Sequence, residues 1–185
     1  MFNFKIYFMS EQSPLSLGTE DIKKLLMRYA VPAIVAMTAA SLYNMMDSIF
    51  IGHGVGALGI AGLAVTFPFI NLAAAFGSLV GVGASTLVSV KMGQKDLKSA
   101  EAVLGNVLLL NTVIGFLFMT VCLIFLDPIL YFFGASADTL PYARDYMKVI
   151  LYGNLITHIY MGLNEVMRAS GYPQRAMMAT LFAVL

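Results

Sequence analysis

The sequence predicts an all-α integral membrane protein. Hydrophobic residues make up 59% of its 185 residues and charged residues 11%, whereas about 25% of a typical soluble domain is charged. The mean hydropathy is +0.83. The charges gather in short clusters that separate long apolar segments, and segments of this length can cross a hydrocarbon core about 30 Å thick. The net charge of +1 gives no reason to expect a nucleic-acid partner.

The first predicted span, about residues 25–51, organises the rest of the chain. Its stretch Tyr29–Met46 carries no charge. Pro32 removes a backbone donor inside the helix, which predicts a kink or hinge. Asp47 lies near the far end of the span. It either belongs to an inward-facing ion site or sits at headgroup level, where an acid costs less than the about 2.5–3.5 kcal/mol of a mid-bilayer position.

Two neighbours of Asp47 slightly favour the ion site. Asn44 and Tyr43 precede it by three and four residues, so all three share one face of the helix. A polar cluster is expensive against lipid and should face the protein interior. We therefore take Asp47 as a candidate cation ligand, Tyr43 and Asn44 as candidate neighbours, and Pro32 as the hinge.

The second and third predicted spans cover about residues 60–90 and 102–126, with a basic connection between them. Pro68 is expected to kink the second span. The single cysteine, Cys122, cannot form an internal disulfide and is expected to act as a small hydrophobe. The second span also carries small residues at every fourth position, which would let another helix approach closely: Ala73, Gly77, Gly81, Ser85 and Ser89.

The remaining chain predicts one more complete span and the start of another. Asp127-Pro128 is expected to end the third helix, and residues 127–142 to form a loop with a short amphipathic piece at 129–133. The fourth span covers about residues 143–167. A fifth hydrophobic segment, 176–185, has too few residues to span a membrane. This predicts a fragment or a truncated reading frame of a larger protein, whose true start is Met1 or Met9.

Several polar residues inside the predicted spans are candidates for lining a cavity: Asn71, Asn111, Asn154 and His158. Hydrogen bonds to neighbouring helices are the competing interpretation for such residues, and His158 could also relay protons or bind solute. Glu165 and Arg168 are expected to pair near the water boundary. The sequence shows no metal-ligand spacing, nucleophile triad or phosphate loop. It therefore predicts no enzyme, no metal and no cofactor.

The distribution of lysine and arginine predicts the orientation, because cytoplasmic loops carry the excess of both. With alternating spans, Arg144 and Lys148 fall on one side and nine cations on the other: Lys5, Lys23, Lys24, Arg28, Lys91, Lys95, Lys98, Arg168 and Arg175. We therefore expect residues 1–24 to form a cytoplasmic N-terminal tail and helix start. Residues 25–185 would form an incomplete transmembrane bundle.

Several motifs, in their order and spacing, resemble the multidrug and toxic compound extrusion (MATE) family. They are Pro32 with Asp47, Ile51-Gly52-His53, Gly83-Ala84-Ser85 leading into Ser89-Val90-Lys91-Met92-Gly93, and Met167-Arg168-Ala169-Ser170-Gly171-Tyr172-Pro173. Phe67-Pro68 resembles a bacterial branch of the family. The resemblance covers nearly the whole chain.

The resemblance implies the N-terminal portion of a twelve-helix transporter, with four full spans here and a truncated fifth. Such proteins lie in the inner cell membrane of bacteria and export small organic, often cationic, compounds in exchange for protons or sodium. It also implies that Asp47 belongs to a cation site, that Pro32 lets the first helix bend, and that the other ligands lie beyond Leu185. The partners implied are the bilayer and the missing C-terminal half.

Three other functions compete with this one. A flippase for lipid-linked saccharides would belong to a related superfamily, but such proteins often place several basic residues in the cavity. A non-transporting membrane subunit or anchor would need neither Asp47 nor Pro32. An intramembrane enzyme is disfavoured, because no pair of acids and no metal-type cluster occurs within the spans.

Overall fold

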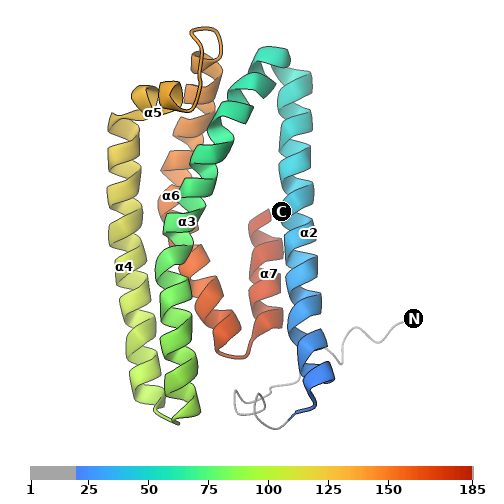
Figure 1. The fold of residues 1–185 in the computed structure, drawn as a ribbon, viewed down its shortest axis with the longest axis vertical. Helices are drawn as coiled ribbons and strands as arrows, with labels where there is room; N and C mark the ends of the chain where they lie inside the picture. Colours follow the sequence, from blue (N-terminus) through green and yellow to red (C-terminus); the bar gives the residue numbers. More distant parts are fainter. Residues whose placement is uncertain (1–19, 185) are drawn as a thin grey trace, which may run out of the picture.

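The computed structural model describes residues 20–184, and every regular element in that range is an α-helix. The long helices stand side by side and alternate in direction, and one short helix lies across an end of the bundle (Figure 1). The elements are α2 (Ile22–Gly54), α3 (Ala57–Gly93), α4 (Leu97–Ile124), α5 (Leu126–Phe132), α6 (Leu140–Ala169) and α7 (Pro173–Val184).

Within the described residues, all five predicted membrane segments are helical, and the four longest helices begin a few residues before the predicted start. One expectation was wrong in detail. Asp127-Pro128 does not break the chain into a loop: α4 ends at Ile124 and α5 begins at Leu126, so both residues lie in the first turn of α5. A proline fits there because the first backbone N–H groups of a helix have no intrahelical acceptor.

Three helices, α2, α3 and α4, are long and apolar enough to cross a membrane. Helix α6 is nearly as long, with 30 residues. Helix α6 is less apolar than these three helices, because it carries more polar and charged side chains along its length. Its status as a fourth complete span stays a prediction.

Helices α3, α4 and α6 form the most extensively packed part of the described chain, and we call them the three-helix unit. Close approach depends on glycine: a Cβ atom on Gly81 of α3 would lie 2.7 Å from the Cα atom of Gly162 on α6. A Cβ atom on Gly162 would in turn overlap the side-chain amide of Asn111 on α4. The three backbones can therefore meet only because these positions carry no side chain.

The predicted stripe of small residues on α3 is correct over its first half only. Ala73, Gly77 and Gly81 are buried, but Ser85 is half-buried and Ser89 is exposed. Each step of four residues overshoots one helical turn by about 40°, so a strict four-residue repeat rotates away from the interface. The buried face continues through Ala84 and Val88 instead.

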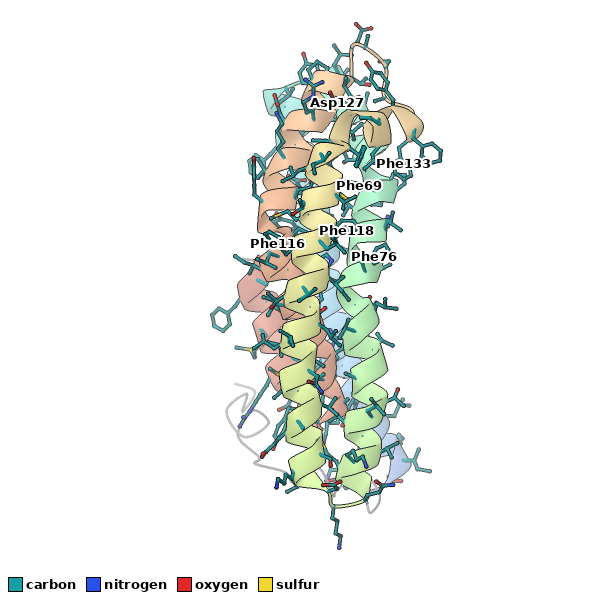
Figure 2. All side chains as sticks on the ribbon, turned by 90° about the vertical axis from the view of Figure 1, so that its left-hand side faces the viewer. Phe69, Phe76, Phe116, Phe118, Asp127 and Phe133 are labelled. Atoms are coloured by element: carbon teal, nitrogen blue, oxygen red, sulfur yellow. The ribbon has the colours of Figure 1, made fainter. Side chains whose placement is uncertain are left out.

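An aromatic cluster ties α5 to the upper end of this unit (Figure 2). The ring centroid of Phe69 on α3 lies 5.9 Å from that of Phe118 on α4 and 6.3 Å from that of Phe133 after α5. Leu126 and Leu130 of α5 are buried in the same core. The short helix is therefore held by apolar packing at the end of the bundle.

Helix α2 lies at the edge and packs mainly against α7. Of its 33 residues, only Pro32 and Ala36 are buried.

The lysines and arginines are distributed unevenly between the two ends of the bundle. Of the ten lysines and arginines that the structure describes, Arg144 and Lys148 lie at the end that carries α5, and the other eight lie in or near turns at the opposite end. Lys5 falls outside the described residues.

Candidate functional site

The candidate cation ligand Asp47 forms a hydrogen bond that joins two helices. It lies seven residues before the end of α2 and is half-buried. The hydroxyl of Tyr146 on α6 donates to it, with 2.9 Å between Tyr146 Oη and Asp47 Oδ2. A hydroxyl donor offsets part of the cost of removing a carboxylate from water. The second carboxylate oxygen, Oδ1, stays available to a proton or a cation.

Tyr146 was not among the residues predicted for this site. Its partner is 99 residues away in sequence, so no local pattern indicates the contact. One signal was available: α2 and α6 run in opposite directions, Tyr146 lies six residues after the start of α6, and Asp47 lies seven residues before the end of α2. Residues at matched depth in antiparallel spans are candidates for contact.

The predicted neighbours Tyr43 and Asn44 lie on the same part of α2 and are exposed. The Asn44 backbone carbonyl accepts a hydrogen bond from Ser48 at 3.0 Å. Neither side chain makes a hydrogen bond to Asp47 within the described part of the chain. Their role beside a bound cation stays a prediction.

The predicted hinge, Pro32, lies in the lower half of α2, and the helix continues through it. Pro32 is one of the two buried residues of α2, and α7 is the main packing partner of that helix. The carboxylate and the hinge are therefore fifteen residues apart on one weakly packed element. The end of α2 that carries Asp47 meets α6, and the body of the helix rests on α7.

His158 lies deep inside the three-helix unit and is 1% exposed. Its Nδ1 atom is 3.0 Å from the carbonyl oxygen of Asn154. A carbonyl can only accept, so Nδ1 is the ring donor. The ring packs against Phe118, with 5.7 Å between centroids, in space left by Gly77 and Gly115. This environment supports a packing role.

Four buried polar atoms inside the same unit have no hydrogen-bond partner in the described structure: Asn111 Nδ2, Asn111 Oδ1, Asn154 Nδ2 and His158 Nε2. For Asn111, the competing interpretation of a hydrogen bond to a neighbouring helix is therefore not met within residues 20–184. Each such group costs about 1–3 kcal/mol in a dry interior. Asn71 is instead exposed and donates to Phe67 of its own helix, at 3.0 Å. A cavity-lining role for these side chains stays a prediction.

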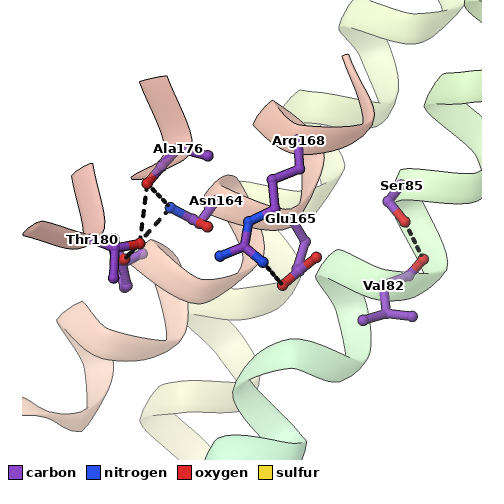
Figure 3. A network of polar contacts seen from close by, with 8 residues as sticks. Val82, Ser85, Asn164, Glu165, Arg168, Ala176 and Thr180 are labelled. Atoms are coloured by element: carbon purple, nitrogen blue, oxygen red, sulfur yellow. Dashed lines mark hydrogen bonds and ion pairs between the residues drawn. The ribbon is translucent and has the colours of Figure 1, made fainter. Parts of the chain in front are cut away.

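A second polar network joins α6 to α7 (Figure 3). Asn164 Nδ2 donates to the carbonyl of Ala176 at 2.9 Å, and Tyr160 donates to Thr180 Oγ1 at 2.7 Å. The predicted pair of Glu165 and Arg168 is confirmed, with 3.8 Å between the charged atoms. The network anchors the start of α7, on which α2 rests.

Among residues 20–184, no three histidine, cysteine, aspartate or glutamate side chains gather closely enough to hold a metal ion. The site that the structure does assemble is a lone carboxylate with one hydroxyl donor. Chemically it can exchange a proton, or bind a monovalent cation with further oxygen ligands from elsewhere.

Comparison with known proteins places this geometry in context. The model of the MatE family matches residues 32–185. The multidrug export protein MepA of Staphylococcus haemolyticus (strain JCSC1435) is 27% identical over 176 residues, which are 95% of this chain and 39% of that protein.

Solved structures agree with the sequence comparison. A multidrug resistance MATE family transporter of the MOP superfamily, in an outward-facing conformation, matches with a TM-score of 0.85 and 27% identity over 94% of this chain and 39% of its own. Two structures of a MATE protein, described as straight and bent, each match with a TM-score of 0.84 and 26% identity over 94% of this chain and 38% of theirs. The chain spans about 39% of the length of the relatives it matches.

Proposed function

The chain belongs to the MatE family, and we propose that it serves a secondary transporter that exports organic, often cationic, compounds in exchange for protons or sodium ions. The chain is a multi-pass membrane protein with relatives that are multidrug exporters. The observation that carries the proposal is the hydrogen bond between Asp47 and Tyr146. It makes the attachment of α2 depend on the charge state of one carboxylate.

The mechanism follows from the strength of that bond. A hydrogen bond to an ionised group contributes about 1.5–3 kcal/mol, and a neutral one about 0.5–1.5 kcal/mol. When Asp47 takes up a proton, or shares its charge with a sodium ion, the attachment of α2 to α6 weakens by about 1 kcal/mol on this scale. That difference shifts a two-state equilibrium about fivefold.

Pro32 is the position at which α2 can bend when its attachment to α6 weakens. The helix lacks one backbone hydrogen bond at the proline, so the segment above it can change direction while the lower part stays on α7. Relatives described in straight and bent conformations support two states of this kind. Ion binding and drug binding then favour opposite states, so uptake of the ion promotes release of the drug, which is antiport.

The test is dye efflux from vesicles that hold the protein as the cell makes it, driven separately by a pH gradient and by a sodium gradient. Asp47→Asn should abolish ion-driven efflux and leave membrane insertion unchanged. Asp138→Asn removes an exposed acid before α6 and should leave efflux intact. Normal efflux by Asp47→Asn would remove the carboxylate from the mechanism, and the gradient that drives the wild-type protein identifies the coupling ion.

Two alternatives give different results. A flippase for lipid-linked saccharides needs cations to hold phosphates, but the described lysines and arginines lie towards the helix ends, which supports small organic solutes. A lipid-linked saccharide translocation assay separates the two. A non-transporting subunit would tolerate Asp47→Asn together with Pro32→Ala without any change in its partner's activity.

We further propose that the protein lies in the inner cell membrane with its N-terminus in the cytoplasm. The clustering of eight cations at one end supports this orientation. Cysteines introduced at His53, in the last turn of α2, and at Gln94, directly after α3, lie at opposite ends of the bundle and test it. Labelling from outside at position 94, but not at position 53, would reverse the orientation.

A further inference from the structure

The end of the bundle that carries few cations has an open pocket that gathers both of them. Arg144 and Lys148, one turn apart on α6, line a space of about 360 Å³ between the ends of α4 and α6. Asp127, on the wall of this pocket, lies at the upper end of the bundle (Figure 2). The remaining lining residues are Leu123, Ile124, Leu126 and Pro128.

The charges of the pocket leave one cation over. Arg144 is paired with Asp127 through two contacts, one of them 2.7 Å between Arg144 Nε and Asp127 Oδ1. Lys148 has no ion-pair partner among residues 20–184. The lining itself therefore carries one net positive charge, centred on the Lys148 ammonium. Asp145, in the same turn but outside the lining, lies close enough for its charge to act on Arg144.

Exposed apolar side chains lie beside Lys148, next to the charged residues of the pocket. Ile124 on α4 is 68% exposed, and on α6 Val149 is 72% and Tyr152 is 67% exposed. Tyr152 lies one turn from Lys148, on the same face. A lysine in such a setting extends its apolar stem along the surface and holds its ammonium at the water boundary, where an anionic headgroup can pair with it.

We propose that this pocket binds the phosphate of an anionic membrane phospholipid. The Lys148 ammonium pairs with the phosphate, and the apolar residues at the end of α4 contact the acyl chains. The net positive lining repels organic cations, and a free phosphate could not use the apolar wall. This inference is independent of the transport function proposed above.

The test is photocrosslinking of the chain in detergent micelles with a phosphatidylglycerol that carries a photoreactive acyl chain, mapped by mass spectrometry of peptides. Label should appear in the peptides that contain Ile124 and Lys148. Unlabelled phosphatidylglycerol should compete at lower concentrations than phosphatidylcholine, and inorganic phosphate should compete least. Lys148→Gln should weaken capture about fivefold, as expected for one cation at a membrane surface.

Two further variants make the result decisive. Lys148→Arg should retain capture, and Asp145→Asn, which changes an exposed acid of the same turn outside the pocket lining, should leave it unweakened. Circular dichroism checks that each variant keeps its helix content. Equal capture by wild type and Lys148→Gln, label confined to other helices, or competition by inorganic phosphate as strong as by phosphatidylglycerol would each overturn the proposal.

Discussion

The three-helix unit and helix α2 have similar lengths of chain per helix but very different packing. Helices α3 and α6 each bury nine residues along their length, whereas α2 buries Pro32 and Ala36 alone. The unit closes around glycines that let backbones touch. Helix α2 is held by its packing on α7 and, near its upper end, by the hydrogen bond from Tyr146 to Asp47.

This difference suggests different roles for the two regions. The three-helix unit of α3, α4 and α6, which we also call the platform, is rigid, whereas α2 can move relative to it. Close-packed interfaces resist small displacements, because every atom has neighbours on all sides. An element with few buried contacts changes position at low cost. The carboxylate and the proline both lie on the weakly held helix, where a change in one hydrogen bond is large relative to the total attachment.

The largest predicted effect is a loss of stability when the contact between α3 and α6 is disrupted. Gly81→Leu places a side chain where a Cβ atom alone would lie 2.7 Å from the Gly162 backbone. Overpacking against backbone should lower the free energy of unfolding by about 3 kcal/mol. The measurement is reversible unfolding in mixed micelles, followed by circular dichroism.

Gly83→Leu is the matched control. Gly83 lies two residues further along the same helix, and a Cβ atom there would meet nothing within 4 Å. Its unfolding free energy should stay within about 0.5 kcal/mol of the wild type. Equal destabilisation by the two variants would show that leucine disturbs α3 for reasons other than contact with α6.

The next effect distinguishes satisfied from unsatisfied polar groups. Asn164→Leu removes the donor to Ala176 and should cost about 1.5 kcal/mol. Asn111→Leu replaces a buried amide without a partner by a side chain of similar shape, and should be neutral or stabilise by about 1 kcal/mol. The same unfolding assay compares them. If Asn111→Leu destabilises as much as Asn164→Leu, then water must satisfy the Asn111 amide in the protein.

A smaller effect tests the attachment of α2. Tyr146→Phe removes the hydroxyl that donates to Asp47 and leaves the ring in place. We combine it with Asp47→Asn in a double-mutant cycle and measure the free energy of unfolding in the same assay. The coupling free energy between the two residues should be about 1 kcal/mol. A coupling near zero would mean that the bond does not hold α2 in place, and the proposed link between ion uptake and helix movement would lose its basis.

The sequence predicted the platform better than the site. Long apolar segments separated by clusters of charges predicted the helices correctly, because the bilayer constrains the polarity and the backbone hydrogen bonds of every residue in a span. The prediction extended the stripe of small residues from Ala73 as far as Ser89. This is too far, because a helix has 3.6 residues per turn and a four-residue repeat rotates out of the interface. Helical geometry alone could have corrected that prediction.

The candidate site depends on information that local patterns do not hold. Asp47 stands out in sequence because it is the acid nearest an uncharged span. Its partner Tyr146 does not, because a tyrosine near a helix start is unremarkable until the neighbouring helix is known. Asn111 and Asn164 look alike in sequence, yet one lacks a partner and the other binds Ala176. Which polar group is satisfied is decided by the pairing of helices.

The smallest effect concerns the turn that closes the platform at its cation-rich end. The backbone N–H of Ser99 donates to Asp96 Oδ1 at 3.1 Å, which caps α4, and Lys91 Nζ lies 3.8 Å from Asp96 Oδ2. The hydrogen bonds from Ser99, and then the charge of Lys91, lower the pKa of Asp96 below its ordinary value of 3.8.

A carboxylate whose pKa is lower in the folded than in the unfolded protein stabilises the fold above the unfolded pKa, and this contribution is lost as pH falls through the folded pKa. The unfolding free energy of the wild type should therefore fall between about pH 5 and pH 3 more steeply than that of Asp96→Asn. Glu101→Gln removes an exposed acid of the same helix and should keep the wild-type slope. Parallel curves for wild type and Asp96→Asn would show that the charge of this cap adds nothing to the platform. The difference between the slopes should be small, because the Asp96 carboxylate stays largely in water.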